Sequence, residues 1–143
     1  MIDSILLVDD EDLFHIVFED ACALLDITLS LQGVHSSDEA EERAINWLGD
    51  ESLKPDCVFV DLNIIGSSFD GIELIRRVNH KYGNGVVIGI ISSSFNEEEM
   101  EKAKEVGAQF WIVKSDEIEP RLEEFREDFE GYRSRTKGFK VYK

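Results

Sequence analysis

The sequence predicts an α/β fold in which a five-stranded parallel sheet carries helices on both faces. Short apolar runs alternate with longer segments whose apolar residues recur at the helical period. This alternation occurs five times along the 143 residues, with turn-forming and capping residues between the segments. Such a pattern is typical of βαβ units with right-handed crossovers. The length fits one domain with a substantial core.

The first half of the chain contains three of the expected strands, over residues 4–9, 27–34 and 57–61. The second of these alternates partly between apolar and polar residues, which favours an edge position in the sheet. Ser36, with Glu39 three residues later, has the pattern of a capping box and is expected to begin a helix. The preceding helix is expected to bury the apolar residues that lie close to a 3.6-residue period, namely Leu13, Ile16, Val17, Ala21, Leu24 and Leu25.

The second half contains the other two strands, over residues 86–91 and 109–113. The helix between them is expected to begin with a capping box of Ser94 and Glu97. It is expected to end near Gly107, which can adopt the left-handed conformation of a C-cap. The last helix, over 118–131, is expected to bury one apolar face that consists of Ile118, Leu122, Phe125, Phe129 and Tyr132.

Polar residues follow or end four of these strands. Asp9 and Asp10 follow the first strand, Asp61 ends the third, Ser92 follows the fourth and Lys114 follows the fifth. Because a parallel sheet presents its ligands at the carboxyl ends of its strands, we expect these side chains to converge. Carboxylates held together are unfavourable unless a cation lies among them, and oxygen ligands suit Mg²⁺. Acids, a hydroxyl and an ammonium in this order indicate a phosphoryl-transfer site.

These segments resemble the receiver domain of two-component response regulators, over about residues 3–130. Each matching piece is common by itself, but their order and spacing together are specific to that family. The matching pieces are Leu6-Leu7-Val8-Asp9-Asp10, Val60-Asp61-Leu62, Asp70-Gly71, Ile90-Ile91-Ser92, and Gly107-Ala108 followed by Val113-Lys114. The resemblance implies a flavodoxin-like receiver fold with strand order 2-1-3-4-5.

The resemblance also implies a role for three of the residues at the strand ends. Asp61 matches the phosphoacceptor, since an ionised carboxylate is a competent oxygen nucleophile. Lys114 matches the lysine that pairs with this carboxylate and later with the phosphate. Ser92 matches the hydroxyl that turns toward the phosphoryl group and donates a hydrogen bond to it.

The implied cofactor is Mg²⁺. By resemblance, Asp10 binds the metal directly and Asp9 binds it through water, while Asp61 and the backbone carbonyl of Asn63 are further ligands. Such oxygen ligands, completed by water, match the octahedral preference of the ion. Glu11 is instead expected to start the first helix, where an acid interacts favourably with the helix dipole.

Three features depart from the family pattern. Ser115 follows Lys114, where the family usually has a proline joined through a cis peptide bond, so a trans bond and a reshaped loop are expected. The segment between Asp61 and Gly71 is about two residues longer than usual, with a bulge expected at its two serines. Trp111 occupies the position of an aromatic residue that commonly turns inward, so we expect either a damped switch or an interface anchor.

Composition excludes several classes of function. The net charge of −16 argues against direct binding to nucleic acid. No apolar run approaches the length of a membrane span, and the N-terminus lacks the basic region of a signal peptide. A cytoplasmic protein without membrane association is therefore expected. Cys22 and Cys57 are expected to be small buried residues, in keeping with that compartment.

The organisation expected from the sequence is a receiver domain over 1–131 and a basic tail over 132–143, with no separate output domain. The tail carries five cations and no acid. It is expected to be either a solvated, frayed end or a docking arm. The second reading rests on Phe139, Val141 and Tyr142, which alternate with the cations.

We therefore expect a stand-alone phosphoacceptor that receives its phosphoryl group from a sensor histidine kinase or a histidine phosphotransfer protein. It would signal to a downstream protein through the face of the fourth helix, fifth strand and fifth helix. It would be no enzyme, beyond catalysing its own phosphorylation and slow dephosphorylation.

Three alternatives remain open. The first is a pseudo-receiver that binds partners without phosphorylation. The second is a flavodoxin-like cofactor binder, whose phosphate the acids would repel. The third is an aspartate-nucleophile phosphatase of the haloacid dehalogenase type, which normally has an acid two residues after the nucleophile, where this chain has Asn63.

Overall fold

Six parallel strands form the centre of this computed structural model, which describes residues 2–27, 30–82 and 85–143. Their order in the sheet is β2-β1-β3-β4-β5-β6. The expected order 2-1-3-4-5 is therefore confirmed, and one further strand extends it. The strands are β1 (Ser4–Val8), β2 (Ser30–Val34), β3 (Cys57–Asp61), β4 (Val87–Ser92), β5 (Phe110–Val113) and β6 (Lys140–Tyr142). Residues 28–29 of the expected second strand lie outside the described residues.

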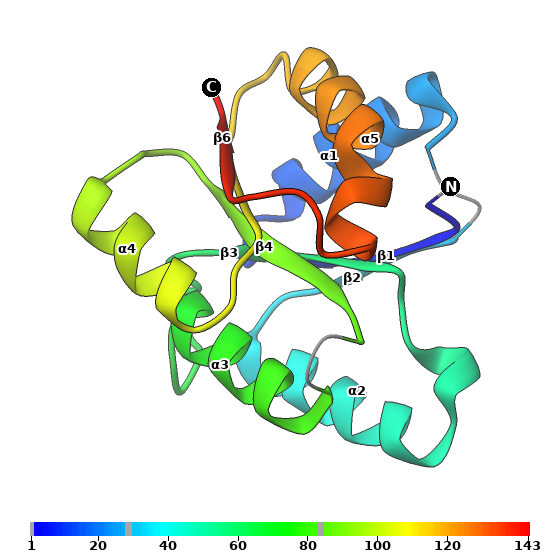
Figure 1. The fold of residues 1–143 in the computed structure, drawn as a ribbon, viewed down its shortest axis with the longest axis vertical. Coiled ribbons are helices and arrows are strands. Elements are labelled where there is room, and N and C mark those ends of the chain that lie inside the picture. The colour runs from blue at the N-terminus through cyan, green and yellow to red at the C-terminus, as the bar shows by residue number, and fades with distance from the viewer. Residues whose placement is uncertain (1, 28–29, 83–84) are drawn as a thin grey trace.

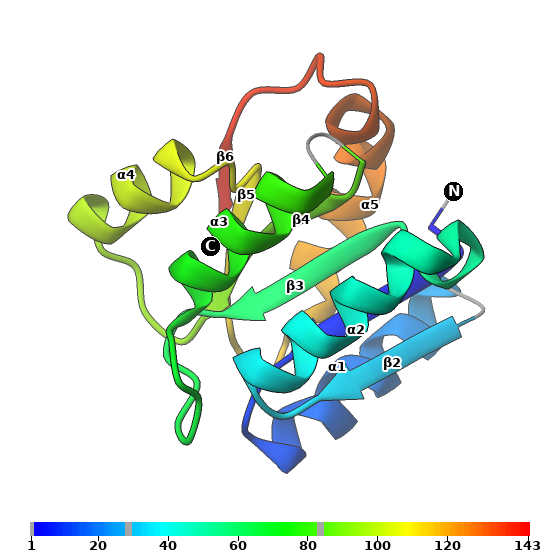
Figure 2. The same cartoon turned by 90° about the horizontal axis from the view of Figure 1, so that it is seen from below.

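Helices cover both faces of this sheet (Figure 1). They are α1 (Asp12–Leu25), α2 (Ser37–Gly49), α3 (Gly71–Tyr82), α4 (Glu97–Glu105) and α5 (Glu119–Arg133), with a short 3-10 turn η1 (Glu51–Leu53). Helices α1 and α5 pack together on one face, and α2, α3 and α4 lie on the other (Figures 1 and 2). The expected three-layer α/β architecture is therefore confirmed.

Alternating side chains of the strands supply the two halves of the core. Phe59 and Phe110 point to the α1 and α5 side, where they meet Phe18 and Phe125 in edge-on aromatic contacts. Val58, Val60 and their neighbours point to the other side. All residues of β3 and β4 are buried, as central strands of a sheet with two covered faces should be. These strands hold the residues at their carboxyl ends in fixed positions.

Helix α1 buries a different face from the one the apolar period suggested. Phe14, Phe18, Ala21 and Cys22 are buried, at helical spacing, against the sheet and α5. Among the six residues expected to be buried, Ala21 is buried and Val17 and Leu25 pack partly buried against the core. Leu13, Ile16 and Leu24 are instead exposed, so the expectation is wrong for these three. The helix carries two apolar stripes, and the aromatic stripe is the one that fills the space beside α5. The outer stripe remains on the surface.

Two of the three expected helix boundaries are confirmed. The Ser36 hydroxyl accepts a hydrogen bond from the Glu39 amide at 3.1 Å and caps α2. Gly107 has φ of +102°, the left-handed region expected after α4. The expected cap of α4 is wrong, because Asn96 and not Ser94 accepts the Glu99 amide, at 3.0 Å. The helix accordingly begins two residues later than a Ser94 cap would place it.

The basic C-terminal segment is a structured part of the sheet. Residues Lys140–Tyr142 form β6, which pairs in parallel with β5 between α4 and α5 (Figure 1). Tyr142 is buried, and its hydroxyl contacts the Tyr132 hydroxyl at 2.7 Å and donates to Asp128 at 2.7 Å. The expectation of a frayed end is therefore wrong for these residues. The burial of Tyr142 and its buried hydrogen bonds hold the strand against α5.

The cations of this segment have partners on helix α5. Lys140 lies 2.6 Å from Glu124 and 3.0 Å from Asp128, and Lys137 lies 3.5 Å from Asp128. The tail is thus drawn to the acidic surface of its own domain. No helix in the described part of the chain combines the length and the apolar character that a membrane span requires.

Candidate functional site

The parallel register brings the expected site residues to one edge of the sheet. Val8 lies opposite Val60, so Asp9 follows β1 beside Asp61 at the end of β3. Ser92 ends β4 opposite Val113, and Lys114 comes next. The amide of Lys114 donates to the Ser92 carbonyl at 2.7 Å, which fixes the start of the loop after β5. Four strand ends therefore supply one site, as the sequence predicts.

Lys114 lies among three carboxylates. Its ammonium nitrogen is 2.6 Å from Oδ2 of Asp9, 3.3 Å from Oδ2 of Asp61 and 3.4 Å from Oε1 of Glu11. The Lys114 side chain is only 8% exposed, and it also lies 4.5 Å from the centre of the Phe14 ring. Asp9 is fully buried, and its Oδ1 accepts the Glu11 amide at 2.8 Å. The ammonium is therefore shared, and its closest partner is Asp9.

Burial and crowding change the acidity of the two central groups. Burial raises the pKa of Asp61 to about 6; Asp9 and Asp10 add to the rise and the Lys114 ammonium opposes it. Burial acts to lower the pKa of Lys114, but the carboxylates of Asp9 and Asp61 outweigh it and the pKa lies above its usual value. Lys114 is thus charged at neutral pH, and Asp61 is an ionised but destabilised carboxylate.

Glu11 belongs to the carboxylate cluster, which the sequence did not suggest. Oxygens of Asp9, Glu11 and Asp61 lie within 4.8 Å of one another. Glu11 also precedes α1 and has no side-chain cap interaction there. Asp10 is half-buried and close enough to affect Asp61, but that set of three does not contain it. Only the rotamer of Glu11 brings its carboxylate to Lys114, and a sequence pattern carries no signal for it.

Ser92 is the last residue of β4, and Asn63 lies just after β3. Ser92 is buried at the end of β4, and its hydroxyl oxygen is 3.4 Å from the Ser94 amide nitrogen. Asn63 is exposed, two residues after Asp61. Among the described residues no peptide bond is cis, so the Lys114–Ser115 bond is trans, as the absence of proline predicts.

Side-chain hydrogen bonds tie the loop between β3 and α3 to the start of α2. The Ser37 amide donates to the Ser67 hydroxyl at 2.8 Å, and the Ser68 amide donates to Asp38 at 2.9 Å. Gly66, with φ of +83°, supports the turn at its tip. The loop projects beyond the carboxyl end of β3 (Figure 2). Ser67 and Ser68 thus connect this loop to the start of α2, beside the strand that carries Asp61.

Gly71 lets the chain return close to the site. Its amide donates to the Leu62 carbonyl at 3.0 Å. A methyl group at this position would overlap the backbone oxygen of Asp61. The glycine of the Asp70-Gly71 pair therefore permits helix α3 to begin directly against the strand that carries Asp61, while the Asp70 side chain caps the helix by accepting the Glu73 amide at 2.9 Å.

Trp111 is buried and cannot serve as a surface anchor. It is fully buried, and its indole N–H donates to the Ser94 carbonyl at 3.2 Å. Phe95 packs against it edge-on, and Val141 of β6 lies opposite it in the register. The expectation of an interface anchor at Trp111 is therefore wrong. The sixth strand covers the edge of β5 that would otherwise expose it.

The donor set fits a hard divalent cation. All three clustered side chains offer carboxylate oxygens, the ligands that Mg²⁺ prefers. Three carboxylates against one ammonium leave an excess of negative charge. Burial is the main cause of the raised pKa of Asp61, and the charges of Asp9 and Asp10 add to it. A cation there would relieve the repulsion. The residues present therefore fit the metal that the sequence implies.

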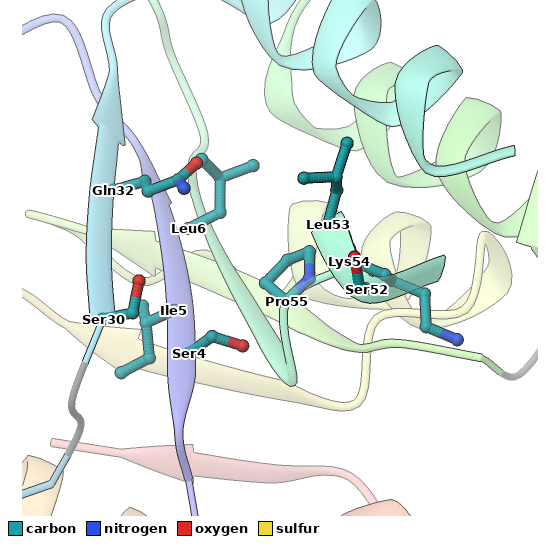
Figure 3. A pocket seen from close by; sticks show the side chains of 9 residues that line it. All are labelled: Ser4, Ile5, Leu6, Ser30, Gln32, Ser52, Leu53, Lys54 and Pro55. Carbon is teal, nitrogen blue, oxygen red and sulfur yellow. The ribbon is translucent and has the colours of Figure 1, made fainter. Parts of the chain in front are cut away.

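Two hollows lie at opposite ends of the sheet. One, of about 240 Å³, adjoins the site and is lined by α1 residues Leu13, Phe14 and Val17 together with Lys114 and Ser115. The other, of about 110 Å³, lies at the amino ends of β1 and β2 beside η1 and Pro55 (Figure 3). Its residues are remote from the carboxyl ends of the strands, so the first of these two hollows is the one beside the site.

The response regulator receiver domain model matches residues 5–123 of the chain. The chain belongs to the response regulator receiver family. This receiver thus has all the strand-end residues that the resemblance implied, and the match stops before β6. No match to the chain was found among curated proteins.

Solved structures of the same fold include a CheY-like receiver domain protein from Methanospirillum hungatei JF-1, with a TM-score of 0.75, 14% identity, and coverage of 94% of this chain and 99% of that one. The phosphorylated cyanobacterial phytochrome response regulator RcpA has a TM-score of 0.69 and 20% identity, with coverage of 94% and 96%. NtrX from Brucella abortus has a TM-score of 0.74 and 24% identity over 95% of this chain, which spans 30% of NtrX.

Proposed function

We propose that this receiver accepts a phosphoryl group on Asp61 from a phosphorylated histidine of a partner protein, in a Mg²⁺-dependent reaction. One observation carries the proposal. Asp61 is 6% exposed, its carboxylate lies 3.3 Å from the Lys114 ammonium that it shares with Asp9, and its oxygens cluster with those of Asp9 and Glu11. A destabilised carboxylate with an ammonium and a metal-binding donor set beside it is suited to attack phosphorus.

The proposed step is an in-line displacement. An Asp61 oxygen forms a bond to phosphorus while the bond from phosphorus to the donor's imidazole nitrogen breaks, and the imidazole keeps the electron pair. Lys114 offers a compact charge on a flexible stem, so it can turn from Asp9 toward the phosphoryl oxygens. Ser92, at the end of the neighbouring strand, is proposed to donate its hydroxyl hydrogen to one of those oxygens.

Asp9, Asp10, Asp61 and the Asn63 carbonyl are proposed to hold the metal, with Asp10 as the direct ligand and Asp9 acting through water. Bound Mg²⁺ neutralises charge on the transferring phosphoryl group. Support comes from the clustered oxygens of Asp9 and Asp61, and from the electrostatic effect of Asp10 on Asp61.

The donor is proposed to be a histidine kinase or a histidine phosphotransfer protein that docks on helix α1. Leu13 is 72% exposed and Ile16 is 56% exposed, and both belong to the outer stripe of α1 within two turns of the site. The hollow between Val17 and Lys114 continues this surface. An apolar surface beside the nucleophile suits a protein donor, which must approach within bonding distance of Asp61.

The output is proposed to be a protein contact on the side of the sheet where the fourth and fifth helices lie. Because β6 pairs with β5, that surface consists of α4, β6 and α5. The same proposal includes a location in the cytoplasm. It also includes no direct contact with nucleic acid, because a net charge of −16 disfavours such contact.

Incubation of the purified chain with acetyl phosphate and Mg²⁺, followed by intact-mass measurement, tests the proposal. The wild-type chain should gain the mass of one phosphoryl group, and Asp61→Asn should gain none. Asp116→Asn, which removes an exposed carboxylate from the loop after β5, is the matched control and should behave as wild type. A gain in the Asp61→Asn variant would contradict the assignment of the nucleophile.

A further inference from the structure

The C-terminal segment that consists of β6 and the following Lys143 touches the loop after Ser92. The Lys143 ammonium lies 4.5 Å from the centre of the Phe95 ring, over its face. Phe95 packs edge-on against Trp111, with ring centres 5.8 Å apart. Val141 lies opposite Trp111 in the β5–β6 register. Val141 of β6 and the adjacent Lys143 therefore lie against the aromatic side chains that connect the β4–α4 loop to the sheet.

The same loop is linked to the candidate hydroxyl of the site. The Ser94 carbonyl accepts the Trp111 indole N–H at 3.2 Å, and the Ser94 amide lies 3.4 Å from the Ser92 hydroxyl oxygen. A continuous series of contacts thus runs from Ser92 through Ser94 and Trp111 to β6. Its last part lies beyond residue 123, where the match to the family model ends.

We propose that the seating of β6 and the occupation of the Asp61 site are energetically coupled through this series of contacts. The inference rests on the proposed function, in which the Ser92 hydroxyl turns toward a phosphoryl group on Asp61. That rotation withdraws the oxygen from the Ser94 amide. The loop then shifts, the Ser94 carbonyl moves from the Trp111 indole, and Phe95 moves from under Lys143. Occupation of the site therefore loosens the end of β6.

Coupling of this kind is reciprocal, so β6 must also affect the site. Loss of the Lys143 contact frees Phe95 and lowers the work of moving the loop. The phosphoryl mimic beryllofluoride, added with Mg²⁺, should therefore bind Lys143→Gln about two- to fivefold more tightly than wild type, since an exposed cation–π contact is of that strength. Trp111→Phe, which removes the indole donor together with part of the buried ring, should change the affinity in the same direction.

The experiment is a beryllofluoride titration of the full chain, combined with amide hydrogen exchange of residues 140–142. Lys102→Gln is the matched control, because it removes the same charge from an exposed position on α4 that ion-pairs with Glu98. We expect wild-type affinity in this control, tighter binding in Lys143→Gln, and faster exchange in β6 of wild type when the mimic is bound.

The outcomes separate this inference from the proposed function. If the mimic fails to bind wild type with Mg²⁺ present, the proposed use of Asp61 fails, and the coupling fails with it. If the mimic binds but β6 exchange is unchanged and Lys143→Gln matches Lys102→Gln, only the coupling is overturned. Equal tightening in both lysine variants would show a general charge effect and would also overturn it.

Discussion

The ammonium of Lys114 lies 2.6 Å from the buried carboxylate of Asp9, and this pair sets the electrostatics of the site. Asp61, at 3.3 Å, shares the same ammonium as a more distant partner. The result is a nucleophile whose negative charge is only partly compensated, which is why burial can raise its pKa to about 6. Two consequences of this arrangement can be measured.

Replacement of Asp61 by asparagine should stabilise the metal-free protein at neutral pH. The folded protein keeps the Asp61 proton up to about pH 6, whereas the unfolded chain loses it near pH 3.8. The free energy of unfolding of wild type therefore falls as the pH rises through this window, by at most about 3 kcal/mol from this group. Urea unfolding in EDTA should show that the free energy of unfolding of Asp61→Asn falls less than that of wild type over the same pH range. A variant less stable than wild type at pH 7.5 would refute this reasoning.

The affinity for Mg²⁺ should depend on pH in the same range. Because protons compete with the metal for Asp61, the apparent dissociation constant should rise about tenfold between pH 7.5 and pH 5. Isothermal titration calorimetry of the purified chain measures this directly. Asp10→Asn should weaken binding further at both pH values, and Asp116→Asn should match wild type. Equal affinities at the two pH values would show that Asp61 is no metal ligand.

Strand β6 should contribute to global stability. Tyr142→Phe removes the hydroxyl that contacts Tyr132 and donates to Asp128, and should lower the free energy of unfolding by about 1–2 kcal/mol. Tyr142→Ala also removes the buried ring and should lower it by about 3–5 kcal/mol. Gly138→Ala, at an open position in the same segment, is the control. If chemical denaturation gives all three variants the same free energy of unfolding as wild type, β6 does not pack against the domain in solution.

The outer stripe of α1 should matter for a protein donor and not for a small one. Leu13→Ser should slow transfer from a phosphorylated histidine phosphotransfer domain by about tenfold, the effect of losing roughly 1.4 kcal/mol at an interface. Phosphorylation by acetyl phosphate should be unchanged. Leu53→Ser, which changes another exposed leucine, in η1 at the other end of the sheet, is the control. Equal slowing in both variants would place docking elsewhere.

The resemblance to receiver domains implies the strand order, which the structure confirms. The sequence pattern predicts that Asp61, Ser92 and Lys114 lie at one edge of the sheet, because the carboxyl ends of parallel strands meet there and each of these residues ends or follows an apolar run. The inward face of α1 could not be predicted, since Leu13 and Phe14 belong to two apolar stripes and only packing against α5 selects between them. A hydrophobic period alone does not distinguish the two stripes.

Strand β6 could not be predicted either, because its formation depends on partners that are distant in the sequence. Its three residues are too few for a clear pattern, and Lys140 suggests a solvated end until its partners Glu124 and Asp128 are brought beside it by α5. The position of Glu11 in the carboxylate cluster depends on a side-chain rotamer, which the sequence does not determine. Long-range partners, rather than local propensity, decide each of these features.

The most direct test of the central claim is to locate the phosphoryl group itself. The chain is phosphorylated with acetyl phosphate and Mg²⁺, and the acyl phosphate is reduced with borohydride, which converts a phosphorylated aspartate to homoserine. Peptide mass mapping then identifies the modified position. Our account predicts homoserine at residue 61 and at no other aspartate. Homoserine at position 9 or 10, or a labelled chain with residue 61 unmodified, would contradict it.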